Sequence, residues 1–293
     1  MSVRVGYCSA FVPPEWIAAY GLQGLRLIPD GSAPAGEGIC PFAMAFARSA
    51  GACDLDAVIV TSTCDQMRRI AEQIDLPLDR VFLMNVPATW QTSTSRDLYL
   101  QELRRLGSFL QRLGGQKPEG WQLAEVMRRY EHGRWALRRP HDGGETGGVR
   151  LALVGGPMRQ RDFRIFDIIK QTGAEVVLDA TEFGQRGMPG AFNQTALEQD
   201  PLAELARAYF DAIPDAFRRP DTLLHEYLRR EFSGRRVQGI ILVRYLWCDL
   251  WHAQLPRLKH DTSLPVVELD LTGQESDLQR MRSRIESLVE ILR

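Results

Sequence analysis

The sequence lacks the features that would place it in a membrane or on nucleic acid. No apolar run in its 293 residues approaches the roughly 18 to 20 that span a bilayer, and the N-terminal MSVRVGYCSAF has no hydrophobic signal core. The formal net charge is -1, so no excess of basic residues favours nucleic acid or an anionic lipid surface. We therefore expect a cytoplasmic protein that binds neither membrane nor nucleic acid.

Cysteine is scarce, and its spacing excludes the common frameworks. The sequence contains Cys8, Cys40, Cys53, Cys64 and Cys248. An odd number of cysteines in a chain without a secretory signal argues against a disulfide framework. No CxxC pair is present, so the spacing of ferredoxins and many zinc sites is absent. Core, catalytic and metal-binding roles remain.

Nucleotide-binding motifs are also missing. Gly155-Gly156 follows a strand pattern, but no GxGxxG or Walker sequence accompanies it. We interpret the pair as a tight turn. Any ATP hydrolysis connected with this protein is expected to belong to a partner.

Strand and helix patterns alternate in each half of the chain, which predicts an α/β fold with parallel sheets. Strands are predicted at 3–7, 25–28, 57–60 and 81–86, and again at 149–156, 175–178, 237–243 and 265–269. The region 95–139 shows helical spacing and no strand signal, and PHDGGETGG at 140–148 is typical of a linker.

We expect three regions. Residues 1–94 form an N-terminal α/β domain carrying Cys40 and Cys64, and residues 95–148 form a helical linker region. Residues 149–293 form a C-terminal α/β domain carrying Cys248.

Three cysteines share one predicted setting, at or near the start of a helix that follows a strand. Cys64 and Cys248 each precede an aspartate, and Cys40 precedes a proline. The positive end of a helix lowers the pKa of a thiol, and thiolates bind soft metals. Three thiolates can hold three irons of a cubane and leave the fourth iron open to a substrate oxygen. By itself the pattern is compatible with a shared metal site or with buried structural cysteines.

Three further residues have competing interpretations. Glu15 opens the helix after the first strand, where it is either a catalytic residue facing the site or a favourable charge in the first helical turn. We interpret Cys8 and Cys53 as core or incidental residues.

Several stretches, in order along almost the whole chain, resemble the iron–sulfur D-component family of 2-hydroxyacyl-CoA dehydratases. This family includes benzoyl-CoA reductase subunits and double-cubane cluster proteins. The matching stretches are YCSAFVPPEWIAAYGLQGLRL, ICPFAMAFARS, VTSTCDQMRR, LALVGGPM with DIIKQTGAEVVLDATEFGQRG, RYLWCDLWHAQLPRLK, and LPVVELDLTG with QRMRSRIESLVEIL.

The resemblance implies two flavodoxin-like domains, each with a four-stranded, mostly parallel sheet, linked by long helices. It implies a [4Fe-4S] cluster held by Cys40, Cys64 and Cys248. The implied activity is a lyase or oxidoreductase reaction of anaerobic metabolism. A ketyl radical of a CoA thioester either loses water or is reduced. The implied partners are an acyl-CoA substrate, an ATP-hydrolysing iron–sulfur activator, and a paralogous subunit or a second copy in a dimer.

The resemblance also leaves an alternative. Subunits of the family usually carry a helical segment before the first strand, which this sequence does not show. An auxiliary iron–sulfur protein, transferring electrons or holding a double-cubane [8Fe-9S] cluster without acting on CoA thioesters, is the second expectation.

Overall fold

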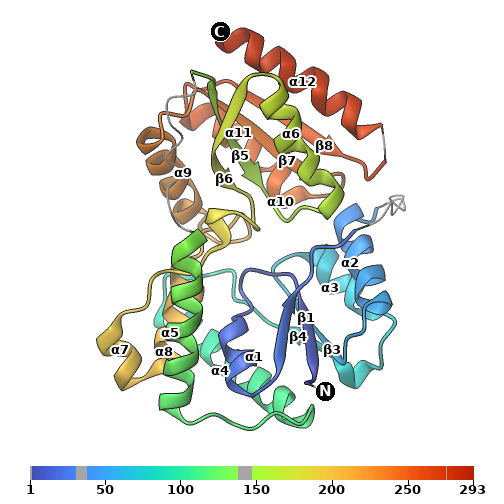
Figure 1. Cartoon of the computed structure of the whole chain (residues 1–293). Coiled ribbons are helices and arrows are strands. Elements are labelled where there is room, and N and C mark those ends of the chain that lie inside the picture. Colours follow the sequence, from blue (N-terminus) through green and yellow to red (C-terminus); the bar gives the residue numbers. More distant parts are fainter. Residues whose placement is uncertain (1, 31–37, 138–146, 275) are drawn as a thin grey trace.

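The computed structural model describes residues 2–30, 38–137, 147–274 and 276–293. Over these residues the chain forms two four-stranded sheets, and Figure 1 shows the first in the lower half of the molecule and the second in the upper half. The predicted linker at 140–148 falls largely outside the described residues. The same holds for the stretch at 30–39, whose glycine, proline and alanine content indicates a loop.

The first sheet is parallel throughout, with the order β2-β1-β3-β4. Its strands are β1 (Arg4–Tyr7), β2 (Gln23–Arg26), β3 (Ala57–Thr61) and β4 (Val81–Met84). The helices between them are α1 (Pro14–Ala19), α2 (Pro41–Ala52) and α3 (Asp65–Ile70). Every residue of β3 is buried, as expected for a β-branched strand in a parallel sheet that helices cover on both faces.

The second sheet repeats this topology, with the order β6-β5-β7-β8 and parallel pairing throughout. Its strands are β5 (Val149–Gly155), β6 (Ala174–Ala180), β7 (Gly239–Tyr245) and β8 (Val266–Leu271). The helices α6 (Arg164–Gln171), α9 (Thr222–Gly234), α10 (Asp249–His252), α11 (Gln254–Asp261) and α12 (Asp277–Leu292) accompany it. The predicted α/β fold, with two flavodoxin-like domains, is confirmed.

The long helices predicted between the halves are α4 (Ser93–Arg112) and α5 (Gly120–Leu137). Phe109 of α4 packs on Phe82 of β4, with ring centroids 5.0 Å apart. Together with the side chains of Tyr209 and Phe210, α4 and α5 contribute to one hydrophobic core with β1. A segment from late in the sequence therefore packs against the first sheet.

Short helices account for the main departures from the predicted elements. The sequence after Cys64 predicts a helix from about Asp65 to Ile74, but the α conformation ends at Ile70 and the chain continues as the 3₁₀ helix η1 (Ala71–Gln73). Residues 200–213 also have a helical pattern, and they divide into α8 (Pro201–Ala206) and the π-helix η5 (Arg207–Asp211). The remaining short helices are η2 (Leu78–Arg80), η3 (Gln160–Phe163), η4 (Gln185–Gly187) and α7 (Gln194–Gln199).

Helix α7 was not predicted from the sequence. Its N-cap is Asn193, whose side chain accepts a hydrogen bond of 3.1 Å from the backbone N–H of Ala196. Asparagine is among the strongest N-cap residues, so a local signal for this helix was present.

Candidate functional site

One cavity lies between the two halves, with a volume of about 70 Å³. Most of its lining lies at or beyond the C-terminal ends of β1, β3, β5, β6 and β7, and the rest comes from the start of α2 and from Asp215. These lining residues are Cys8, Ser9, Phe11, Cys40, Phe42, Ala43, Thr61, Thr63, Cys64, Gln66, Met67, Gly156, Pro157, Glu182, Asp215, Arg244, Tyr245, Cys248, Leu250 and Trp251.

The sheet topology places the cavity. In each sheet the chain runs from its first strand to a neighbour on one side and then crosses back to a neighbour on the other side. The direction of winding therefore reverses between β1 and β3 in the first sheet and between β5 and β7 in the second. Such a reversal opens a crevice beyond the carboxyl ends of the strands, where α/β proteins bind ligands. Two crevices of this kind contribute to one cavity here.

The three predicted cysteines meet at this cavity. Cys40, Cys64 and Cys248 are the N-cap residues of α2, α3 and α10, and all three line it. The carbonyl of each accepts the first backbone hydrogen bond of its helix, at 3.1, 3.0 and 3.0 Å respectively. Helix N-termini from both halves therefore direct thiols toward one space.

The helix termini act on the thiols as expected, but they do not decide the direction of the pKa shifts. Burial is the largest influence, and it raises the pKa of Cys40 to about 12 and also raises the pKa values of Cys64 and Cys248. Backbone N–H groups of the helices act in the opposite direction but are outweighed. A bound cation must therefore displace the thiol protons, as metal binding to cysteine generally does.

The donor set fits an iron–sulfur cluster better than one metal ion. Over the described residues, no three His, Cys, Asp or Glu side chains are arranged to hold a metal ion. A cubane does not require such convergence, because each cysteine ligates a different iron. The three thiols that line one cavity are the donor set that a [4Fe-4S] cluster bound by Cys40, Cys64 and Cys248 would need.

The two cysteines interpreted as core or incidental lie in different environments. Cys53 is exposed at the C-terminal end of α2. Cys8 is 5 % exposed, follows β1 directly and lines the cavity with the other three thiols. Cys8 directly follows a predicted central strand, and this position in the sequence could have indicated that it lines the site.

Glu15 lies apart from the cavity lining. Its side chain is fully buried and forms an ion pair with Arg134 of α5. Its other oxygen accepts a hydrogen bond of 2.6 Å from the hydroxyl of Tyr209. Glu15 thus connects α1 to α5 and η5.

The second half contributes acidic groups that the sequence did not single out. Glu182 follows β6, and its Oε1 accepts a hydrogen bond of 2.9 Å from the backbone N–H of Ala10. Burial raises the pKa of Glu182, and the nearby charge of Asp215 raises it further. Asp215 pairs with the fully buried Arg186, with Oδ2 and Nη1 2.6 Å apart.

The two tryptophans near Cys248 have different surroundings. Trp251 is 4 % exposed and lines the cavity, with the guanidinium of Arg186 4.9 Å from its ring centroid. Trp247 is 42 % exposed and has a φ of 70°, which is unusual for a residue other than glycine. Trp251 therefore covers the cavity, while Trp247 faces solvent.

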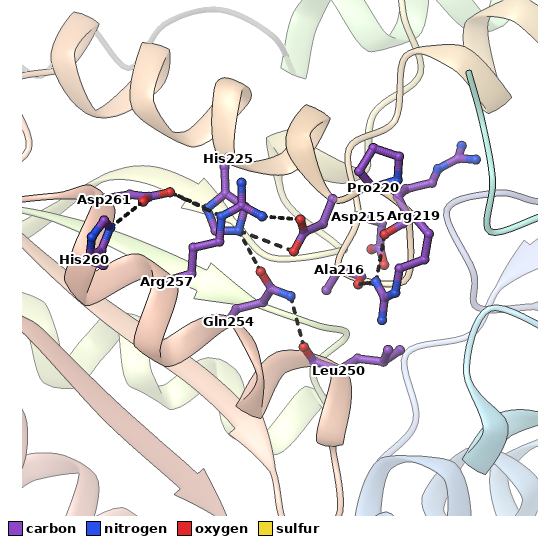
Figure 2. Close-up of polar contacts among 12 residues, drawn as sticks. Asp215, Ala216, Arg219, Pro220, His225, Leu250, Gln254, Arg257, His260 and Asp261 are labelled. Carbon is purple, nitrogen blue, oxygen red and sulfur yellow. Dashed lines mark hydrogen bonds and ion pairs between the residues drawn. The ribbon is translucent and has the colours of Figure 1, made fainter. Parts of the chain in front are cut away.

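A buried histidine stabilises the helices that follow Cys248. His225 of α9 lies 2.7 Å from Oε1 of Gln254 on α11, and Gln254 also donates a hydrogen bond of 3.4 Å to the carbonyl of Leu250 (Figure 2). The carboxylates of Asp221 and Asp261 lie 3.7 and 3.6 Å from its ring nitrogens. This network links α9 to the helices next to the cavity.

The network predicts a dependence of stability on pH. Burial is the main cause that lowers the pKa of His225, and the charge of Arg257 acts in the same direction, against Asp221 and Asp261. The unfolded chain therefore binds this proton first as the pH falls below about 6.5. We expect the free energy of unfolding, measured with urea, to fall between pH 7.5 and pH 5, and to fall less in His225→Gln.

The matched control is His132→Gln, because His132 is exposed. This variant is expected to keep the pH profile of the parent protein. Equal pH profiles for His225→Gln and the parent would contradict the assigned role of His225.

The fold and the site together define a class: a two-sheet α/β protein with cysteine-capped helices around a cavity between its halves. The family of the 2-hydroxyglutaryl-CoA dehydratase D-component matches residues 9–144 and 138–292. The chain belongs to this family, and the resemblance noted in the sequence is confirmed.

Curated proteins and solved structures show no close similarity to the chain. No curated protein matches the chain. Among solved structures, the Ni²⁺ complex of the SBP FpvC from Pseudomonas aeruginosa is 12% identical, with 100% of this chain and 97% of that chain covered and a TM-score of 0.28. A periplasmic metal binding protein from Candidatus Liberibacter asiaticus is 9% identical, with 100% of both chains covered and a TM-score of 0.28. Likenesses this weak carry no argument about fold or function.

A membrane-spanning helix was not expected from the sequence. Within the described part of the chain, no helix combines the length and the apolar character needed to cross a bilayer.

Proposed function

We propose that this chain is the [4Fe-4S] cluster-binding subunit of an enzyme of the 2-hydroxyacyl-CoA dehydratase type. The proposed reaction removes water from a 2-hydroxyacyl-CoA thioester or reduces a related CoA thioester. Membership of the D-component family supports the reaction class. The proposed domains are those expected from the sequence, with Cys40 and Cys64 in residues 1–94 and Cys248 in residues 149–293.

The observation that carries the proposal is the meeting of Cys40, Cys64 and Cys248 at one cavity. The first two cap helices of the first half, and Cys248 caps a helix of the second half. Buried structural cysteines have no reason to converge from three separate loops. Ligands of a shared group have to do so.

A bound cubane of this kind would supply one-electron chemistry to a substrate next to it. The chain's own residues prepare the surroundings. Phe11, Phe42 and Trp251 contribute apolar surface to the lining, which excludes water and lowers the local dielectric. Glu182 lies on the same lining, and burial raises the pKa of its carboxyl group. We assign it to hold a proton for a leaving hydroxyl at Oε2, because Oε1 accepts from the backbone N–H of Ala10.

The proposed partners follow from the chemistry. The chain carries no ATP-binding motif, so we assign the supply of low-potential electrons to a separate ATP-hydrolysing activator. We assign the second subunit of a dimer to a paralogue or a second copy, because a low-potential cluster needs shielding from oxygen and water. The substrate is an acyl-CoA.

The first test is iron and acid-labile sulfide per chain in protein purified without oxygen, together with the EPR spectrum after reduction. About four of each, with a cubane signal, are expected. Protein of this kind should then convert a 2-hydroxyacyl-CoA in the presence of an activator and ATP. Absence of iron from protein never exposed to air would contradict the proposal.

A second candidate is an auxiliary iron–sulfur protein that transfers electrons or holds a double-cubane [8Fe-9S] cluster. The fourth thiol at the cavity, Cys8, favours it, because a cluster with four cysteine ligands has no open iron. Iron content separates the two cluster types, since about eight irons per cluster would identify the double cubane.

A further inference from the structure

Four thiols, and not three, line the cavity. Cys8 is the first residue beyond β1, and β1 pairs with β3, the strand that leads to Cys64. Parallel neighbouring strands end at the same edge of a sheet, so the chain segments that follow them lie side by side. The thiol of Cys8 is therefore placed beside the loop of an expected cluster ligand.

The four cysteines lie around one space. Cys8, Cys40, Cys64 and Cys248 all line the cavity. Cys8 and Cys40 belong to one buried cluster, and Cys64 packs against it. Cys8 therefore lies in the same group as the three expected ligands.

The backbone around Cys8 is held by contacts with β2 and with the second half. The carbonyl of Cys8 accepts a hydrogen bond of 3.1 Å from Nε of Arg26. Arg26 also donates to the carbonyl of Glu182 at 2.9 Å, and the Glu182 side chain accepts from Ala10. These bonds hold the loop against the cavity in a position that does not depend on the thiol, as ligand loops generally require.

We propose that Cys8 is a fourth protein ligand of the cluster, bound to the iron that Cys40, Cys64 and Cys248 leave without a thiolate. The inference rests on the proposed function, because it needs the cluster to be present. In a site closed in this way, a substrate oxygen binds iron only by replacing the Cys8 thiolate.

The test uses the loss of one iron from the anaerobic, cluster-loaded protein. A cubane with three cysteine ligands readily loses its fourth iron on mild oxidation and becomes a three-iron cluster, whereas four cysteine ligands retain it. On titration with ferricyanide, the parent protein is expected to keep about four irons. Cys8→Ala is expected to lose about one of the four and to show the EPR signal of a three-iron cluster.

Cys53→Ser is the control, because Cys53 is exposed and does not line the cavity. It should behave as the parent. Circular dichroism checks folding, and Cys8→Ser provides a second variant that preserves side-chain volume and is expected to shift the EPR spectrum of the reduced cluster.

The possible outcomes distinguish failure of the proposed fourth ligand from failure of the proposed function. A parent protein that loses iron as readily as Cys8→Ala would overturn the fourth ligand and leave the proposed function standing. An unchanged EPR spectrum in Cys8→Ser would also overturn it. A parent protein that assembles no cluster would overturn both.

Discussion

Cys248→Ser is expected to reduce the iron content of the anaerobic protein from about four per chain to nearly none. Cys248 is the cysteine through which the second half would bind the cluster, and a serine hydroxyl is a much poorer ligand for iron than a thiolate. The reduced variant should show no cubane EPR signal. Iron and sulfide analysis on protein prepared in parallel with the parent measures the effect.

The control is the same cysteine-to-serine substitution at a position outside the cavity. Cys53→Ser removes a thiol that is exposed at the end of α2, and it is expected to retain all the iron. Far-ultraviolet circular dichroism of both variants separates loss of the cluster from loss of the fold. A full complement of iron in Cys248→Ser would mean that the two halves do not share a cluster.

Arg134→Met is expected to lower the free energy of unfolding by about 3–5 kcal/mol, because it leaves a buried carboxylate without its partner. Glu15 is fully buried, and the side chain of Arg134 is only 13 % exposed. Tyr209 still donates to Glu15 in the variant, but one hydroxyl does not replace a guanidinium. Urea unfolding at neutral pH measures the loss.

Arg128→Met on the same helix is the matched control. Arg128 is 39 % exposed and pairs with Glu125 and Glu198 at 4.0 and 3.4 Å. Exposed pairs of this kind are worth about 0–1 kcal/mol, so this variant should remain close to the parent. Equal losses of unfolding free energy in Arg134→Met and Arg128→Met would show that the buried pair contributes no more to stability than the exposed one.

The same comparison bears on Glu15 as a candidate catalytic residue. The buried pair assigns it to the packing of α1 against α5, so the double variant Glu15→Leu/Arg134→Leu should recover part of the stability lost in Arg134→Met. A stable Glu15→Gln variant that keeps its cluster and loses activity would instead support the catalytic assignment.

Local sequence patterns were sufficient to predict most strands and helices, and to place three of the cysteines at helix starts. The run Ala57–Thr61 is β-branched and apolar, so it predicted a buried parallel strand wherever the chain placed it. Proline after Cys40 and aspartate after Cys64 and Cys248 are signals of helix starts, and all three helices begin there. Such signals depend only on neighbouring residues, which is why the sequence contains them.

Contacts between distant segments had no such signal. Glu182 meets Ala10 across the two halves, and Glu15 meets Arg134 and Tyr209. A carboxylate in the first turn of a helix looks the same in sequence whether it faces solvent or a buried guanidinium. Only the packing of η5 and α5 against the first sheet decided that Glu15 is buried and paired.

The pKa values of the thiols also depend partly on local sequence and partly on tertiary structure. By itself the sequence determined that Cys40, Cys64 and Cys248 stand at helix N-termini, where the backbone favours a negative charge. The tertiary structure decided that burial outweighs this effect and raises the pKa values of these thiols, and that Cys8 joins them. Burial is a property of everything packed around a group, so it is set only when the two halves come together.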